Sequence, residues 1–164
     1  MSTVPFRVGQ GFDVHELVPG GPITLGGVKI EHSHHLKGHS DADALLHAIT
    51  DAIVGATGLG DIGRLFPDHD PAYAGADSRV LLRQAYAAAL DKGWCAVNVD
   101  ATIHAEAPKI TPHAAQMVAN IAQDLELSPD SVNIKGKTNE ALGFLGRREG
   151  IAVTAVVLMT RVVT

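Results

Sequence analysis

Apolar residues recur at helical spacing in three stretches, which predicts three helices. The first covers about residues 41–56 and begins after Ser40, a good N-cap residue. The second covers about residues 78–92 with Ser78 as its cap, and the third covers about residues 111–125. Each stretch has one apolar face, a pattern typical of helices that pack on a sheet.

Shorter apolar runs predict the strands. Gly26-Gly27 separates two of them and is a two-residue hairpin signal. In the run before residue 105, alternation places Val97 and Val99 on the same apolar face. The last run is apolar on both faces, which predicts a strand at the centre of a sheet or at a subunit interface. The runs are 6–14, 23–25, 28–30, 94–105, 132–137 and 151–163.

The order of these elements predicts the fold class. Strands come first, then two helices, a strand, a helix and two strands. This order, without repeats or a linker, indicates an α/β fold of the α+β type. We expect a single domain over residues 1–164, with a mixed β-sheet and helices packed on it.

The segment between residues 58 and 77 has little periodicity. It is rich in glycine and proline, and it mixes carboxylates with apolar residues in Asp61-Ile62-Gly63 and Leu65-Phe66-Pro67-Asp68. A loop of this length inside a compact domain is usually functional or disordered. We interpret it as an active-site loop, with a flexible surface insertion as the alternative.

Composition narrows the class of protein. The net charge is −5 and no basic run occurs, which argues against nucleic-acid binding. The single cysteine, Cys95, excludes an internal disulfide. The longest apolar run, Ile151 to Met159, is too short to span a bilayer, and the first dozen residues lack a signal-peptide pattern. We therefore expect a soluble cytoplasmic protein that has no membrane partner.

Three side chains could form a metal site. Asp13 and His15 lie two residues apart on a predicted strand and so point to one side, while His47 comes from the first helix. Three N/O ligands with an open fourth position describe a catalytic zinc site. Asp51, one helical turn after His47, is predicted to orient that histidine. Ordinary surface or capping histidines remain the alternative, because the chain has nine histidines.

Two other segments offer polar groups. Residues 32, 34 and 35 are histidines in a predicted polar loop, which suits either a solvated loop or a metal-binding tract. At Lys135 to Glu140 a strand passes into a predicted helical turn, where backbone N–H groups and lysines could bind phosphate and Glu140 could hold a divalent cation. A capped turn with solvated lysines is the alternative there. Lys109 lies in a third candidate segment.

Five motifs occur in order across nearly the whole chain. They are Gly11-Phe12-Asp13-Val14-His15; His39-Ser40-Asp41-x-Asp43 with His47; Gly60-Asp61-Ile62-Gly63 with Phe66-Pro67-Asp68; Ala107-Pro108-Lys109; and Thr138-x-Glu140 with Leu142-Gly143-Phe144. Together they resemble the 2-C-methyl-D-erythritol 2,4-cyclodiphosphate synthase family, the cyclising enzymes of the non-mevalonate isoprenoid pathway. Lys137 departs from the alanine or threonine often found there in the family.

The resemblance implies metal ligands and catalytic residues. It implies zinc held by Asp13, His15 and His47, and magnesium or manganese held by Glu140. It also implies a catalytic set that comprises Asp13, His39, Ser40, Lys109 and Thr138.

The resemblance further implies how substrate and subunits are arranged. The methylerythritol phosphate part would lie among His39, Ser40, Asp61, Ile62, Gly63, Phe66 and Asp68. The cytidine diphosphate part would lie near Ala105, Pro108, Lys109 and Thr138. The family is a homotrimer with active sites between subunits, and an isoprenoid diphosphate would lie in a central cavity near Phe144, Arg147 and Glu149.

The implied reaction needs no protein nucleophile. The substrate, 4-diphosphocytidyl-2-C-methyl-D-erythritol 2-phosphate, carries its own, since its 2-phosphate is largely dianionic at neutral pH. Two other readings use the same residues. One is a zinc phosphohydrolase that acts on nucleotide diphosphates, and the other is a non-catalytic trimer that binds isoprenoid diphosphates.

Overall fold

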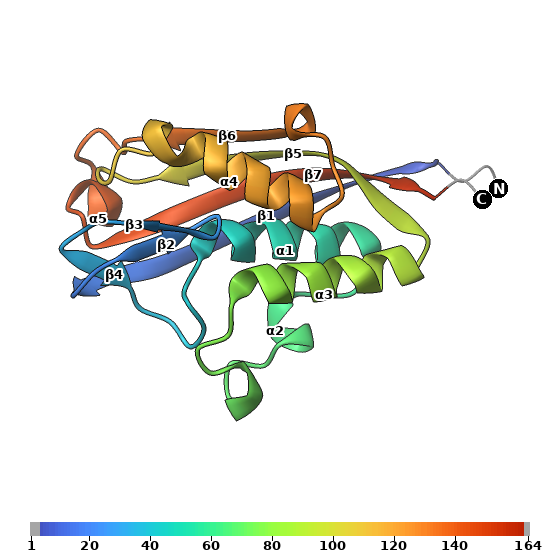
Figure 1. Cartoon of the computed structure of the whole chain (residues 1–164), viewed down its shortest axis with the longest axis horizontal. Coiled ribbons are helices and arrows are strands. Elements are labelled where there is room, and N and C mark those ends of the chain that lie inside the picture. Colours follow the sequence, from blue (N-terminus) through green and yellow to red (C-terminus); the bar gives the residue numbers. More distant parts are fainter. Residues whose placement is uncertain (1–3, 163–164) are drawn as a thin grey trace.

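The computed structural model describes residues 4–162, which form a sheet with helices on one side (Figure 1). The five-stranded sheet has the order β4-β1-β7-β5-β6. The β5–β6 pair is parallel and the other neighbours are antiparallel, so the predicted mixed sheet is confirmed. The strands are β1 (Phe6–Pro19), β4 (His34–Leu36), β5 (Trp94–His104), β6 (Val132–Lys137) and β7 (Gly150–Arg161).

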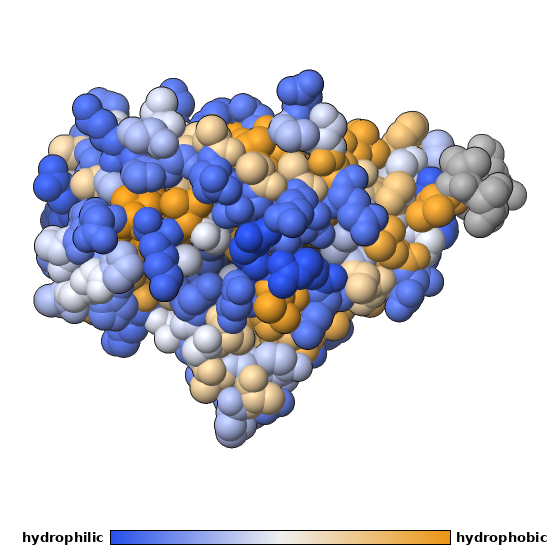
Figure 2. Space-filling model, in the orientation of Figure 1, coloured by the Kyte–Doolittle hydropathy of each residue, from blue (hydrophilic) through white to orange (hydrophobic). Residues whose placement is uncertain are grey.

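The helices form the second layer, and a separate hairpin lies beside it. The hairpin joins β2 (Ile23–Leu25) to β3 (Val28–Ile30) through Gly26 and Gly27, as predicted. In the view of Figure 2 hydrophilic side chains cover most of the surface, with hydrophobic groups scattered among them. The helices are α1 (Ala44–Thr57), α2 (Ile62–Leu65), α3 (Ser78–Asp91), α4 (Thr111–Asp124) and α5 (Gly143–Gly146), and the 3-10 turns are η1 (Pro71–Tyr73) and η2 (Pro129–Ser131).

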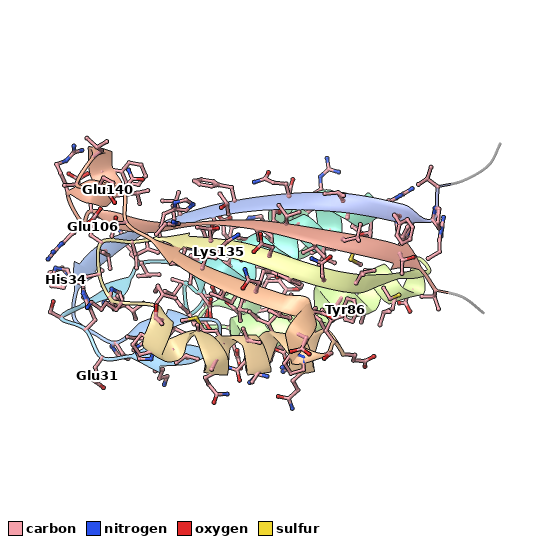
Figure 3. The ribbon with its side chains drawn as sticks, turned by 90° about the horizontal axis from the view of Figure 1, so that it is seen from above. Glu31, His34, Tyr86, Glu106, Lys135 and Glu140 are labelled. Carbon is pink, nitrogen blue, oxygen red and sulfur yellow. The ribbon has the colours of Figure 1, made fainter. Side chains whose placement is uncertain are left out.

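The opposite face of the sheet carries exposed apolar side chains. No helix of residues 4–162 covers this face, which is seen from above in Figure 3. Val8, Phe12 and Val156 project from it and are 67%, 53% and 43% exposed. The predicted central position of the last strand is confirmed, because β7 lies between β1 and β5. A central strand with exposed apolar groups on one side indicates a surface that another molecule covers.

Glycine lets α1 approach β1 very closely. A Cβ atom built on Gly11 would lie 1.9 Å from the Ala48 carbonyl oxygen, and one on Gly9 would lie 1.8 Å from the Ala52 oxygen. Real Cβ atoms do not make contacts this short, so only glycine fits at these two positions. Since Gly11 precedes Asp13 on the same strand face, this close approach also brings Asp13 towards His47 of α1.

Gly11→Ala is therefore expected to push β1 away from α1. We expect a loss of about 3 kcal/mol in unfolding free energy, at the upper end of typical overpacking costs. Urea unfolding at a fixed protein concentration measures it. Gly55→Ala is the matched control, because Gly55 lies in α1 and its added Cβ would meet no atom within 4 Å apart from its chain neighbours and the adjoining helix backbone. That variant should gain up to about 1 kcal/mol. Equal unfolding midpoints for the two variants would contradict the packing argument.

Several local predictions were wrong in detail. The first helix begins at Ala44 and is capped by Asp43, whose side chain is fully buried and accepts N–H groups from Gly26, Gly27 and Leu46. Ser40 is therefore not the cap. Asp77, and not Ser78, caps α3. In both cases the aspartate one position before the helix supplies the oxygen that an N-cap requires.

Three further segments differ from the sequence prediction. His34–Leu36, expected in a loop, pairs with the end of β1 as β4. The helical turn predicted at residues 138–140 occurs later, as α5, because Glu140 and Ala141 have positive φ angles. The register of β5 against β7 shifts between Ala96 and Asn98. This irregularity at residue 97 breaks the alternation that had placed it on the buried face.

Candidate active site and metal centre

Asp13, His15 and His47 direct their polar atoms to one point between β1 and α1. Asp13 Oδ2 lies 2.8 Å from His15 Nε2 and 3.2 Å from His47 Nδ1. These two ring nitrogens are 3.3 Å apart. One potential ligand atom from each residue lies within 4.8 Å of the other two. The structure therefore assembles the three side chains that the sequence predicted as a metal site.

The backbone determines which nitrogen of His15 faces this point. His15 Nδ1–H donates to the Lys37 carbonyl oxygen at 2.8 Å, so in the neutral ring Nε2 carries the lone pair. That lone pair, the Asp13 carboxylate and His47 Nδ1 are three electron-rich atoms at one point. Such atoms repel one another unless a proton or a metal cation lies between them. The donor set therefore fits zinc, with one side left open as in catalytic sites.

The pKa shifts indicate the same preference for positive charge. Burial would raise the pKa of Asp13, but its hydrogen-bond and charge interactions with His15 and His47 outweigh burial and lower the pKa to about 2. Burial would lower the pKa of His15, but its hydrogen bond and charge interaction with Asp13 outweigh burial and raise the pKa above the usual value for histidine. The Asp13 carboxylate therefore favours a positive charge on the neighbouring His15 imidazole. A metal cation bound between them would supply that positive charge in place of the proton.

The metal cluster lies on the wall of a cavity of about 440 Å³. Four of the five substrate residues predicted in the 58–77 segment line it together with the cluster, so this segment does form a wall of the site. Asp61 instead caps α2, where its side chain accepts the Arg64 N–H at 3.0 Å. The predicted residues that line the cavity are Asp13, His15, His39, Ser40, His47, Ile62, Gly63, Phe66 and Asp68.

The predicted role of Asp51 is wrong. Its carboxylate accepts the backbone N–H of Ile62 at 2.9 Å. Side chains on a helix lean towards its N-terminus, so the ring of His47 points away from the following turn. Asp51 instead attaches the start of α2 to α1, which places the loop over the metal cluster.

The second group of predicted residues lies at the ends of β5 and β6. Ala105 N–H donates to the Lys137 carbonyl oxygen at 2.9 Å, and Thr138 Oγ1 donates to Glu140 Oε1 at 2.7 Å. Thr138, Glu140 and Lys109 are exposed. None of these residues lines the cavity beside the metal cluster. The sequence-predicted site therefore forms two separate groups within one chain.

Sequence reasoning missed residues in both groups. Tyr73 and Leu81 line the metal-side cavity, and the ring of Tyr73 lies 5.4 Å from that of Phe66. Its position in the unpatterned loop was the available signal. Glu106 accepts N–H groups from residues 139 and 141, which orders the turn that carries Glu140 (Figure 3). No sequence pattern marked Glu106.

The remaining candidates lie on α5 and in the turn that follows it. Phe144 is 45% exposed, and Arg147 pairs with Glu149 at 2.9 Å.

The histidine tract lies in and just before β4, where His32 and His34 have ring centroids 5.8 Å apart. The only group of three potential metal ligands among residues 4–162 is Asp13, His15 and His47, so the histidine tract does not form a second such group there.

A mixed sheet that carries an open Asp-His-His cluster beside a cavity is typical of metal-dependent enzymes. Comparison with known proteins gives the particular family. The chain belongs to the YgbB family, which it matches over residues 6–160. It is 70% identical to the 2-C-methyl-D-erythritol 2,4-cyclodiphosphate synthase of Bordetella avium (strain 197N), over 97% of this chain and 98% of that protein. The synthase of Dechloromonas aromatica (strain RCB) is 66% identical, over 96% of this chain and 98% of that protein.

Solved structures agree with this assignment. The bifunctional IspDF from Campylobacter jejuni superposes with a TM-score of 0.92 at 44% identity, over 95% of this chain and 42% of that longer chain. A Plasmodium falciparum IspF complex with CDP has a TM-score of 0.85 at 34% identity, over 99% of this chain and all of that one. The family and fold predicted from the motifs are confirmed. Within residues 4–162, no helix has the length and apolar character needed to cross a membrane.

Proposed function

We propose that this enzyme converts 4-diphosphocytidyl-2-C-methyl-D-erythritol 2-phosphate to 2-C-methyl-D-erythritol 2,4-cyclodiphosphate and CMP. An oxygen of the 2-phosphate attacks the β-phosphorus, the bond from that phosphorus to the CMP oxygen breaks, and CMP leaves. The observation that carries the proposal is the open cluster of Asp13, His15 and His47 beside a cavity that can hold a small polyol phosphate. Close sequence relatives named as this synthase support it.

The chain's own groups bring the two phosphates together. Asp13, His15 and His47 would hold zinc, and Glu140 would hold magnesium or manganese. When bound, these ions neutralise and polarise the phosphate oxygens around the transferring phosphoryl group. His39 and Ser40 lie on the cavity wall next to the cluster, where they would hold the phosphate end in line for attack. Ile62, Gly63, Phe66 and Asp68 would enclose the methylerythritol part, and Asp61 would support them from outside the cavity as the cap of α2.

The other group of residues would hold the cytidine diphosphate part. Lys109 and Thr138 are exposed, and so offer an ammonium and a hydroxyl to phosphate oxygens, while Ala105 and Pro108 would contact the cytidine. A CDP complex among the solved relatives supports nucleotide binding. The carboxylate of Glu140 is exposed beside Thr138, which fits an ion that is shared between one carboxylate and substrate phosphates.

We also propose a homotrimer with active sites between subunits. Asp13 is in register with Val153, Val153 with Ile103, and Ile103 with Gly136 of β6. Three strand spacings, about 14 Å, therefore separate the metal cluster from β6. Ile103 and Val153 are fully buried, so packed core lies between the two groups. A neighbouring copy that brings its β5–β6 end to this cavity would complete the site, and the uncovered sheet face offers the contact surface.

Three further proposals concern the domain, a second ligand and the cell compartment. Residues 1–164 act as one domain, since the family match extends over nearly all of them. An isoprenoid diphosphate could bind near Phe144 and Arg147, which pair an exposed ring with a guanidinium. The enzyme works in the cytoplasm, which an acidic chain with one cysteine suits.

Phosphorus NMR of the purified protein with its substrate, zinc and magnesium tests the reaction. We expect signals of a cyclic diphosphate together with CMP. Open-chain phosphates would instead support a zinc phosphohydrolase. Absence of turnover, with isoprenoid diphosphate still bound by a protein stripped of zinc, would support the non-catalytic binding protein.

A further inference from the structure

The nitrogen of His47 that faces away from the metal cluster has a partner from a distant part of the chain. His47 Nε2 lies 2.8 Å from the hydroxyl oxygen of Ser78, the first residue of α3. The same hydroxyl is hydrogen-bonded to the carboxylate of Asp41, which also accepts the Ser78 backbone N–H at 3.1 Å. Asp41, Ser78 and His47 therefore form a continuous hydrogen-bonded chain that ends at the cluster.

The chemistry of these groups determines the direction of each hydrogen bond. A carboxylate can only accept, so Ser78 donates its one hydroxyl proton to Asp41. The Ser78 oxygen is then left to accept from His47, which requires the proton to sit on Nε2. In neutral imidazole this leaves the lone pair on Nδ1, the atom that lies 3.2 Å from Asp13.

We propose that Ser78 and Asp41 are positioning residues for the zinc ligand His47. Through the hydroxyl of Ser78, the charge of Asp41 holds the His47 ring in one orientation and one tautomer, with Nδ1 directed at the metal. The same charge makes Nδ1 a stronger electron-pair donor to the metal, as carboxylates do when they hydrogen-bond to metal-ligating histidines. The proposal rests on the zinc site of the proposed function. It adds the residues that determine which nitrogen of His47 binds the metal.

Burial distinguishes Ser78 from the other hydroxyl near this nitrogen. Ser40 Oγ lies 3.1 Å from His47 Nε2, but Ser40 lines the cavity, where we have placed substrate. Ser78 is 1% exposed and is not among the cavity residues. Its contact with His47 therefore does not depend on what the cavity contains. Asp41 is in turn held by its own backbone N–H, which donates to the Ala76 carbonyl oxygen at 3.1 Å.

Zinc affinity and the His47 ring proton test the proposal without reference to turnover. In the zinc-loaded wild type, NMR of protein labelled with ¹⁵N-histidine should show a proton on His47 Nε2 that exchanges slowly with water. Ser78→Ala should weaken zinc binding about tenfold to a hundredfold in competition with a chelator, and the proton should exchange faster. Asp41→Asn removes the charge but no heavy atom, and should weaken zinc binding in the same direction even if Ser78→Ala does not fold.

Thr50→Val is the matched control. Thr50 is also 1% exposed, but its hydroxyl bonds the Leu46 carbonyl oxygen of its own helix. It should bind zinc as wild type does. If Ser78→Ala and Asp41→Asn bind zinc as tightly as Thr50→Val, with an unchanged Nε2 proton, the positioning role is refuted. If instead His47→Ala binds zinc as tightly as wild type, the zinc site itself is wrong, which is a distinguishable outcome.

Discussion

His47→Ala is expected to lose bound zinc and to lower the turnover of the cyclisation about a thousandfold or more. His47 supplies one of only three protein ligands in the cluster, and its Nδ1 lies within 3.3 Å of both partners. A metal that polarises phosphate oxygens contributes several kcal/mol to transition-state stabilisation, and each 1.4 kcal/mol corresponds to tenfold in rate. Metal analysis of the purified protein and CMP release at saturating substrate measure the two effects.

His113→Ala is the control for this variant. His113 lies on α4, and its side chain forms no hydrogen bond or ion pair with any of residues 4–162. It should retain zinc and turnover. A His47→Ala protein with the wild-type zinc content, or with turnover like that of His113→Ala, would show that the cluster is not the metal centre.

Val156→Glu is expected to dissociate the trimer and to remove activity while the metal cluster stays intact. Val156 projects from the middle of the uncovered sheet face, opposite Asp100 on the neighbouring strand. The charge of Asp100 is already matched by Lys135 at 2.6 Å, so a new carboxylate there would have to be buried on assembly without a partner, which costs several kcal/mol. Because the side chain is already 43% exposed in one chain, the fold of the single subunit should tolerate the change.

Light scattering and zinc content separate the two parts of this prediction. Val156→Glu should be monomeric, bind zinc and give little turnover. Val80→Glu is the matched control, since Val80 is 39% exposed but lies on α3 in the helix layer. That variant should remain trimeric and active. A fully active Val156→Glu monomer would show that one subunit is sufficient for the reaction.

Much of the fold could be predicted because its signals are local. Gly26-Gly27 between two short apolar runs predicted the hairpin, and the doubly apolar run from residue 151 predicted a central strand. Element boundaries were less accurate, because they depend on contacts with distant residues. The helix α1 begins after Asp43 partly because the Asp43 side chain accepts N–H groups from Gly26 and Gly27, and no pattern around residue 43 records those partners.

In the site, too, local patterns were predictable and contacts between distant residues were not. Alternation in a strand was sufficient to place Asp13 and His15 on one side, and this prediction was confirmed. The partner of His47 could not be found from helical spacing, which suggested Asp51. Ser78 is 31 residues away in sequence and reaches His47 only because α3 packs beside α1. Tertiary packing, and not sequence proximity, therefore determines which groups surround the metal ligands.

The claim that two subunits share each active site can be tested by mixing two inactive variants. His47→Ala removes the metal side, and a double variant, Lys109→Ala with Thr138→Ala, removes the cytidine side. Co-expressed with different tags and purified as mixed trimers, they form some sites with both sides intact. If each site joins two subunits, one of the three sites in every mixed trimer has both sides intact, so the mixed trimers should restore about a third of wild-type CMP release. Mixed trimers as inactive as either parent would place each site within one chain and contradict this account.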